Sequence, residues 1–151
     1  MIHFTADLHF SHSNIIKYCN RPYRDIEHMD QSLIDNWNSV VKSQDIVFIL
    51  GDFSFRNPHT FTAKLNGALV FLCGNHDNIK GFNTLRVISR GVHIFMQHYP
   101  YPKEVPDKTE LILCGHVHDK WKRKEWNALP MINVGVDVWD YKPVSINEVI
   151  G

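Results

Sequence analysis

The hydrophobic positions of the chain fall into short runs rich in β-branched and aromatic residues, which is the pattern of buried β-strands. Nearly every run ends in Gly, Asp, Asn or His. Ligand sites in open α/β sheets gather at the carboxyl ends of strands, so the polar residues that follow these runs are candidates for a shared site. The predicted strands are Ile2 to Ala6, Ile46 to Leu50, Ala68 to Cys73, Val92 to Gln97, Leu111 to Cys114 and Met131 to Val136.

Between the first two predicted strands, apolar residues recur at three- and four-residue intervals, which is the period of an amphipathic helix. This pattern predicts a helix at about 27 to 43. A shorter helix is predicted to begin near Ser11 or Ser13. Another is predicted after Asn57 and Pro58, which form a good cap and first-turn pair. The second half of the chain has fewer helical patterns and more turns, so we expect it to be rich in sheet.

The length and composition favour one compact domain. The chain has 151 residues, of which 44% are hydrophobic and 21% are charged, and these are ordinary values for a globular protein. No internal repeat, low-complexity segment or linker interrupts it. We therefore expect a single domain over residues 1–151, with an α/β fold.

The charge balance argues against a general attraction to polyanions. The formal net charge is +0, so no global field draws the protein to nucleic acid or to an anionic membrane. Nucleic acid is therefore not favoured as a partner. A basic run of four residues could bind phosphate locally, although such runs are more often solvated loops; it consists of Lys120, Lys122, Arg123 and Lys124.

The location is inferred from what the sequence lacks and from its cysteines. No apolar run approaches the roughly 20 residues that span a bilayer, and the first residues do not have the pattern of a cleaved leader. The three cysteines are odd in number and lack zinc-binding spacing. A reducing compartment fits them best, so we expect a cytoplasmic protein that does not contact a membrane.

Five groups of polar residues stand at the ends of the predicted strands. All of them offer oxygen or nitrogen donors that suit divalent metals. Residues i and i+2 of an extended segment point to the same side, so each Asp-x-His or His-x-His pair is expected to face one site. The groups are Asp7-Leu8-His9, Gly51-Asp52, Gly74-Asn75-His76-Asp77, His98, and Gly115-His116-Val117-His118.

Three of these groups begin with glycine. Gly51, Gly74 and Gly115 directly precede Asp52, Asn75 and His116. Glycine lets the chain turn sharply at a strand end and lets the backbone approach a ligand closely. We therefore expect these positions to keep the site open.

The ordered set of five motifs resembles the calcineurin-like metallophosphoesterase family. All five are present in family order, and they span residues 7 to 118. The segment Asn133 to Asp137 also looks like bacterial and phage members of the family. The resemblance implies a four-layer α-β-β-α sandwich, in which two mixed sheets are flanked by helices.

The resemblance also implies a binuclear metal centre. It implies that Asp7, His9 and His118 hold one divalent ion, that Asn75, His98 and His116 hold the other, and that Asp52 bridges both. Two such ions can hold a bridging hydroxide and clamp the phosphoryl oxygens for in-line attack at phosphorus. We expect manganese; iron, nickel and zinc also suit a donor set without thiolate.

Further roles are assigned to residues beside the ligands. His76 is not needed as a ligand, and its family counterpart protonates the departing alkoxide. Asp77 is expected to orient the His76 imidazole. Arg56 could bind a phosphoryl oxygen through its planar fork of donors. Asn14 and His12 could line the substrate pocket, although a capping or surface role is the usual one for a residue in the position of His12.

These inferences predict a phosphoesterase that acts on small phosphate esters, and phosphodiesters more than monoesters. A catalytically inactive metal-binding scaffold of the same fold is the alternative from another class. A helical HD-type phosphohydrolase is a third reading, prompted by His76-Asp77 and His118-Asp119. No long insertion caps the site, so either the pocket is open or a second subunit of a homo-oligomer supplies the lid.

Overall fold

The computed structural model describes residues 1–151 and contains two mixed β-sheets. The first sheet has the order β3-β2-β1-β9, with β1, β2 and β3 parallel and β9 antiparallel to β1. The second has the order β4-β5-β6-β8-β7, with β5, β6 and β8 parallel and an antiparallel strand at each edge. The strands are β1 (Ile2–Thr5), β2 (Ile46–Leu50), β3 (Ala68–Leu72), β4 (Thr84–Ser89), β5 (Val92–Gln97), β6 (Leu111–Cys114), β7 (Arg123–Trp126), β8 (Leu129–Asn133) and β9 (Val144–Ser145).

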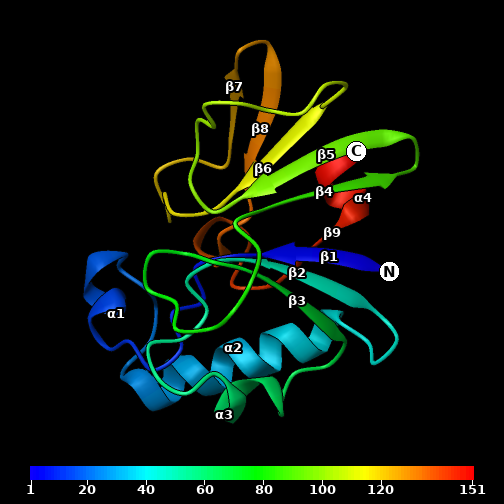
Figure 1. Cartoon of the computed structure of the whole chain (residues 1–151). Coiled ribbons are helices and arrows are strands. Elements are labelled where there is room, and N and C mark those ends of the chain that lie inside the picture. Colours follow the sequence, from blue (N-terminus) through cyan, green and yellow to red (C-terminus); the bar gives the residue numbers. More distant parts are fainter.

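Three helices pack around the first sheet, two along its outer face and the third, α1, beyond the carboxyl ends of its strands (Figure 1). They are α1 (Asn14–Tyr18), α2 (Ile26–Val40) and α3 (His59–Thr62). The longest, α2, begins at Asp25, whose side chain accepts a hydrogen bond from the backbone N–H of His28, and it buries Trp37 fully against the sheet. Its amphipathic pattern is therefore satisfied by packing on the strands.

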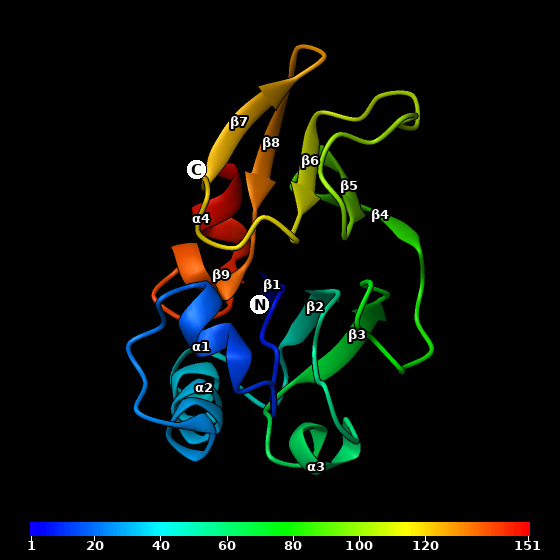
Figure 2. The same ribbon diagram turned by 90° about the vertical axis from the view of Figure 1, so that its left-hand side faces the viewer.

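A second hydrophobic core lies between the two sheets. Phe4, Leu50 and Leu72 of the first sheet meet Met96 and Leu113 of the second, and all five are fully buried. The short helix α4 (Ile146–Ile150) closes one end of this core, and the 3-10 helix η1 (Val136–Val138) follows β8. Figure 2, turned by 90°, shows α4 beside β9 between the sheets.

The outer face of the second sheet carries no helix. Its buried residues Phe95, Ile112 and Met131 are covered by Val105 and by aromatic side chains such as Trp121. The predicted sandwich of two mixed sheets is confirmed, and the layer expected to be helical on this side is formed by loop residues. These two sheets also exclude the helical HD-type reading. No helix of the protein is both long enough and apolar enough to cross a bilayer.

The six predicted strands and three predicted helices are present, with ends shifted by a few residues at most. Three strands were not predicted. β4 and β7 are edge strands whose residues are largely exposed, and β9 has two residues. The basic run from Lys120 to Lys124 was expected to be a loop; its last two residues belong to β7, and the Lys122 ammonium lies 3.6 Å from the centre of the Trp139 ring.

Candidate metal centre

The strand register brings the first two motifs together. Thr5 of β1 pairs with Ile49 of β2, and beyond both strands the chains stay side by side. The backbone N–H of Asp7 donates to the carbonyl of Gly51 at 3.1 Å, and that of His9 donates to Asp52 at 3.0 Å. The parallel order of these strands therefore places two carboxylates and an imidazole at one edge of the sheet.

The second sheet adds its own polar residues at the same edge. His98 follows β5, and His116 and His118 follow β6. A bridge between Ala6 and Gly135 joins the edge of β1 to the chain after β8, with Val136 N–H donating to the Ala6 carbonyl. The two sheets thus converge at the ends from which the polar motifs project.

Two groups of metal-ligand side chains form here, and each contains donor atoms within 4.8 Å of one another. We call Asp7, His9 and His118 the first position. The second group is Asp52, His98 and His116. The side-chain oxygen Oδ1 of Asn75 lies 3.1 Å from His98 Nε2. We call Asn75, His98 and His116 the second position.

Asp52 stands between the two positions. Its Oδ2 lies 3.5 Å from His9 Nε2 and 3.5 Å from His98 Nε2. The other oxygen, Oδ1, accepts a hydrogen bond from the backbone N–H of His76 at 3.0 Å. One oxygen of this buried carboxylate therefore faces imidazoles of both positions while the other is held by the backbone.

The prediction that the Asp-x-His and His-x-His motifs are extended segments is wrong. Asp7, His9, His116 and His118 have positive φ angles of 56°, 53°, 71° and 49°, so neither segment is extended. Asp52 shares this left-handed conformation, with φ 53°. Such backbone costs roughly 1–3 kcal/mol at each non-glycine residue and is concentrated at functional sites. The members of each pair therefore face one site from left-handed backbone rather than from an extended segment.

The glycines before the motifs are required by close packing. A Cβ atom on Gly74 would lie 2.2 Å from Asp52 Oδ1, and one on Gly51 would lie 2.4 Å from His98 Nδ1. A Cβ on Gly115 would lie 2.8 Å from Asp7 Oδ2. Contacts this short essentially never occur in proteins, so a side chain at any of these positions would displace the neighbouring ligand.

The buried polar atoms of the site indicate whether a cation fits. Asp7 Oδ1 and His9 Nε2 are fully shielded and have no hydrogen-bond partner. Each unsatisfied group of this kind costs roughly 1–3 kcal/mol. Carboxylate oxygen and imidazole nitrogen are both ligands of divalent ions, so a metal bound here would satisfy atoms that the protein leaves without partners.

Burial and charged neighbours shift the pKa values of several proposed ligands. Burial raises the pKa of Asp7 to about 6, although nearby His118 and His98 oppose the shift. Burial, together with neighbouring His118 and Arg21, lowers the pKa of His9 to about 2, so its ring is neutral and keeps a lone pair. Burial also lowers the pKa of His116. Although burial opposes the shift, the Asp137 carboxylate raises the pKa of His118 to about 10, so a metal at the first position must displace a proton from this ring.

His98 has a fixed tautomer. Its Nδ1 lies 2.7 Å from the carbonyl oxygen of Leu50 and donates to it, which leaves Nε2 as the acceptor. This Nε2 is the atom that faces Asp52 and Asn75. A backbone carbonyl on the far ring nitrogen is a usual way to orient a metal-binding histidine.

Asp77 does not have the role expected of it. Its two oxygens accept hydrogen bonds from the backbone N–H groups of Asp52 at 2.7 Å, Phe53 at 2.8 Å and Gly74 at 2.7 Å. Both oxygens are therefore used to hold the loops of Asp52 and Gly74 together, and no hydrogen bond joins Asp77 to the His76 ring.

The other sequence-predicted residues lie at different distances from the centre. His76 is exposed, with its ring centre 5.7 Å from that of His9. His12 belongs to the cluster, since its Nδ1 lies 3.3 Å from His9 Nδ1 and its ring stacks on exposed Phe55. Arg56 and Asn14 are exposed. The backbone carbonyl and N–H of Arg56 are hydrogen-bonded to the Ser54 hydroxyl.

Three residues of the site were missed by the sequence analysis. Arg21 and Asp137 form a buried ion pair behind the first position, and Tyr99 packs its ring against His98 and His116 with centroids 4.9 Å apart. Arg21 carries no periodic or motif signal. Asp137 lies in the segment that resembled family members, but its partner could not be inferred from sequence.

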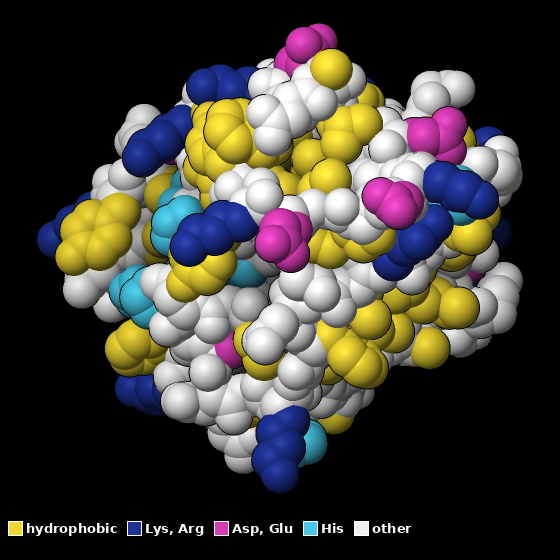
Figure 3. Space-filling view, turned by 45° about the horizontal axis from the view of Figure 1, so that its top comes forward, with side chains coloured by type: hydrophobic (Ala, Val, Ile, Leu, Met, Phe, Trp, Pro, Cys, Tyr) yellow, Lys and Arg dark blue, Asp and Glu magenta, His cyan; other side chains and the backbone are white.

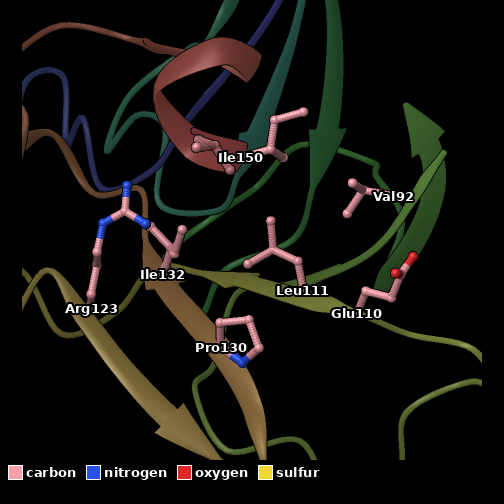
Figure 4. A pocket seen from close by; sticks show the side chains of 8 residues that line it. Val92, Glu110, Leu111, Arg123, Pro130, Ile132 and Ile150 are labelled. Atoms are coloured by element: carbon pink, nitrogen blue, oxygen red, sulfur yellow. The ribbon is translucent and has the colours of Figure 1, made fainter. Parts of the chain in front are cut away.

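The buried ligands of the metal centre are bordered by exposed side chains, among them Asn75, His76 and Phe55. None of the cavities of the protein is lined by its ligands. One cavity of about 350 Å³ is lined by residues such as Val92, Leu111 and Ile150 near the opposite ends of the strands (Figure 4). Figure 3 shows histidine side chains at the surface on its left side, beside hydrophobic and basic side chains.

Comparison with known proteins identifies relatives of undetermined function. The chain is 40% identical to the uncharacterized protein MJ1445 of Methanocaldococcus jannaschii, over 99% of this chain and 89% of that protein. It resembles the crystal structure of AQ665 from Aquifex aeolicus, a protein of unknown function, with a TM-score of 0.75, 27% identity and coverage of 99% of this chain and 97% of that one. No protein-family model matches.

More distant structures share the fold. Vps29 of Entamoeba histolytica in complex with zinc has a TM-score of 0.56 at 16% identity, covering 89% of this chain and 73% of that one. An archaeal phosphodiesterase has a TM-score of 0.52 at 16% identity, covering 89% of this chain and 82% of that one. These two likenesses show a shared fold.

Proposed function

The chain belongs to the same family as MJ1445 of Methanocaldococcus jannaschii, and we propose that it is a metal-dependent phosphoesterase of the calcineurin-like metallophosphoesterase family. The observation that carries the proposal is the position of Asp52. Its Oδ2 lies at the same distance, 3.5 Å, from an imidazole of each metal position. A shared carboxylate between two nitrogen- and oxygen-rich groups is the arrangement that a binuclear centre requires.

The ligand assignment follows from the two clusters. Asp7, His9 and His118 would hold one divalent ion, Asn75, His98 and His116 would hold the other, and Asp52 would contact both. When bound, two such ions activate water as a nucleophile near neutral pH and stabilise the charge that develops on the phosphoryl oxygens. Manganese is the ion we propose, and iron, nickel and zinc suit the same donors.

His76 is the proposed general acid. Its backbone is anchored to Asp52 Oδ1 while its exposed side chain is free of structural hydrogen bonds. From there the ring can donate a proton to the oxygen of the leaving group. His12 stacks on Phe55 beside it, with ring centres of His12 and His76 6.3 Å apart. This pair would contact the leaving group.

The exposed border of the metal centre favours phosphodiesters. An ester with substituents on both sides of phosphorus can lie across the centre without entering a cavity. Arg56 and Asn14 are proposed to reach the substrate from the exposed loops around the centre. The archaeal phosphodiesterase of the same fold agrees with this choice.

Three free cysteines support a cytoplasmic location.

The test is hydrolysis of bis(p-nitrophenyl) phosphate and p-nitrophenyl phosphate by chelator-stripped protein, with manganese, nickel, zinc or magnesium added back separately. We expect a transition metal to restore turnover, with the diester cleaved faster. Two bound ions without turnover of either ester would replace the proposal by the inactive scaffold. Faster cleavage of the monoester would retain the class and reverse the substrate preference.

A further inference from the structure

A buried arginine binds the backbone that carries two ligands of the first position. The Arg21 side chain is fully buried. Its Nη2 donates to the carbonyl of Asp7 at 2.6 Å, and its Nη1 donates to the carbonyl of Leu8 at 2.9 Å. These carbonyls lie in the left-handed turn from Asp7 to His9, and no backbone N–H donates to either of them.

The same guanidinium is paired with Asp137. Arg21 Nε lies 2.9 Å from Asp137 Oδ1, and Nη2 lies 3.0 Å from Oδ2. This bidentate pairing fixes both planes with respect to each other. Figure 2 shows the two segments side by side, with the chain after β8 next to α1.

Asp137 in turn faces a ligand from the other sheet. Its Oδ2 lies 3.6 Å from His118 Nδ1, which is buried and has no hydrogen-bond partner, so the carboxylate acts on this ring nitrogen through its charge. These two residues and Cys19 form one cluster of donor atoms. A carboxylate on this side of the ring favours a proton on Nδ1 and leaves Nε2 as the nitrogen available to a metal. Arg21 is thus linked through hydrogen bonds to the turn that carries Asp7 and His9, and through Asp137 to His118.

A buried ion pair contributes little net stability, because the loss of hydration offsets the attraction of the charges. The value of this one lies in geometry, since its members join two sheets at the ligands of a single metal position. We propose that Arg21 and Asp137 are positioning residues that assemble the first position and set the tautomer of His118. The inference rests on the proposed two-metal site and does not depend on the reaction being phosphoester hydrolysis.

Asp137→Asn gives the sharpest test because it preserves size. The new amide would donate to His118 Nδ1, so the proton of the neutral ring would move to Nε2 and block its lone pair. We expect the affinity for the first-position ion to fall by roughly 10- to 100-fold, the usual effect of losing such a partner. The second position should keep its affinity. Calorimetric titration of chelator-stripped protein with Mn²⁺ measures both, and the visible absorption of bound Co²⁺ reports the change in ligands.

Two further variants keep the inference falsifiable. Arg21→Lys retains the charge but cannot make four hydrogen bonds. It should lower the affinity for the first-position ion by a smaller factor than Asp137→Asn does. Asp45→Asn is the matched control: Asp45 is also a buried carboxylate, bound by the amino group of Met1 and the backbone N–H of Lys42, and it lies at the opposite end of β2 from Asp52. It should lower the melting temperature without changing either metal affinity.

The inference is supported if one affinity is lost selectively in Asp137→Asn and Arg21→Lys while Asp45→Asn retains both. It is overturned if both affinities stay at the wild-type value, or if both fall together in proportion to the loss of stability. Wild-type protein that binds two ions but cleaves no ester would remove the proposed function alone. Full activity with unchanged metal binding in Asp137→Asn would remove this inference alone.

Discussion

The first and second metal positions use similar donors but are held in different ways. Asp7 and His9 are buried in a strained turn, and Arg21 binds the backbone between them. In the second position, His98 is buried but Asn75 is exposed and His116 is only half-buried. The first position therefore has two of its three ligands buried, with His118 half-buried, whereas the second has only one buried ligand.

This difference has a consequence for metal binding. A preorganised site loses less conformational entropy when an ion binds. The unsatisfied atoms Asp7 Oδ1 and His9 Nε2 also belong to the first position. We therefore expect the first position to bind its ion more tightly than the second, and the following predictions test the contrast in order of the size of their effects.

The largest effect is expected from Asp52→Ala, because Asp52 is shared by the two positions. Loss of the carboxylate should weaken the binding of both ions. Diester turnover should fall by about 1,000-fold or more, since the metals stabilise the transition state by several kcal/mol. Metal analysis together with turnover measures this. Retention of one ion at full affinity would show that Asp52 belongs to one position only.

His76→Ala is expected to separate chemistry from metal binding. Both ions should stay bound, while hydrolysis of an ester with a poor leaving group should slow by about 100-fold or more. Cleavage of bis(p-nitrophenyl) phosphate should change much less, because p-nitrophenolate leaves without a proton. An equal loss on both esters would argue against the general-acid role.

Gly74→Ala tests the close packing behind the second position. The added methyl group would meet Asp52 Oδ1 at 2.2 Å, so Asp52 must move, and we expect turnover to fall by roughly 10- to 100-fold with weaker metal binding. Gly91→Ala is the control. A Cβ at Gly91 meets nothing within 4 Å, although its φ of +82° makes the change costly. It should lower stability by about 1 kcal/mol and leave turnover unchanged.

Asp77→Asn should have the smallest effect on activity. The carboxylate accepts three backbone hydrogen bonds, so the amide should cost roughly 1–3 kcal/mol in the free energy of unfolding. Turnover should fall only a few-fold, through loosening of the loop that holds Asp52. Urea unfolding and turnover of the same sample measure both. A loss as large as that of His76→Ala, with stability unchanged, would contradict this structural role and favour the one predicted from sequence.

The strands that could be predicted are the buried ones. Runs such as Ile46–Leu50 and Leu111–Cys114 are apolar on both faces and stand out in the sequence. β4 and β7 are half-exposed edge strands, and their turns do not have Asn-Gly or Asp-Gly sequences. They are made by Arg90-Gly91, with φ of 53° and 82°, and by Asn127-Ala128, with φ of 48° and 62°, which are the positive values of the tight hairpin turn.

The grouping of the candidate site residues could be predicted from the sequence, but their backbone conformation and their buried partners could not. Side chains that follow strands could be grouped because parallel strands end at one edge, and the structure does bring Asp7, Asp52, His98 and His116 to that edge. The left-handed backbone of the motifs was not predicted, because positive φ is uncommon for any residue other than glycine, even though Asp and His adopt it more often than most. The contact between Arg21 and Asp137 spans 116 positions in the chain, and no local pattern encodes such a partner.

The most direct test is a stepwise titration of chelator-stripped protein with Mn²⁺, in which calorimetry counts the bound ions and bis(p-nitrophenyl) phosphate reports turnover at each step. The account predicts two binding events of unequal affinity, a tight one without turnover and a weaker one with which turnover appears. Binding of a single ion per chain, or turnover that is complete after the first equivalent, would contradict the binuclear centre on which the account depends.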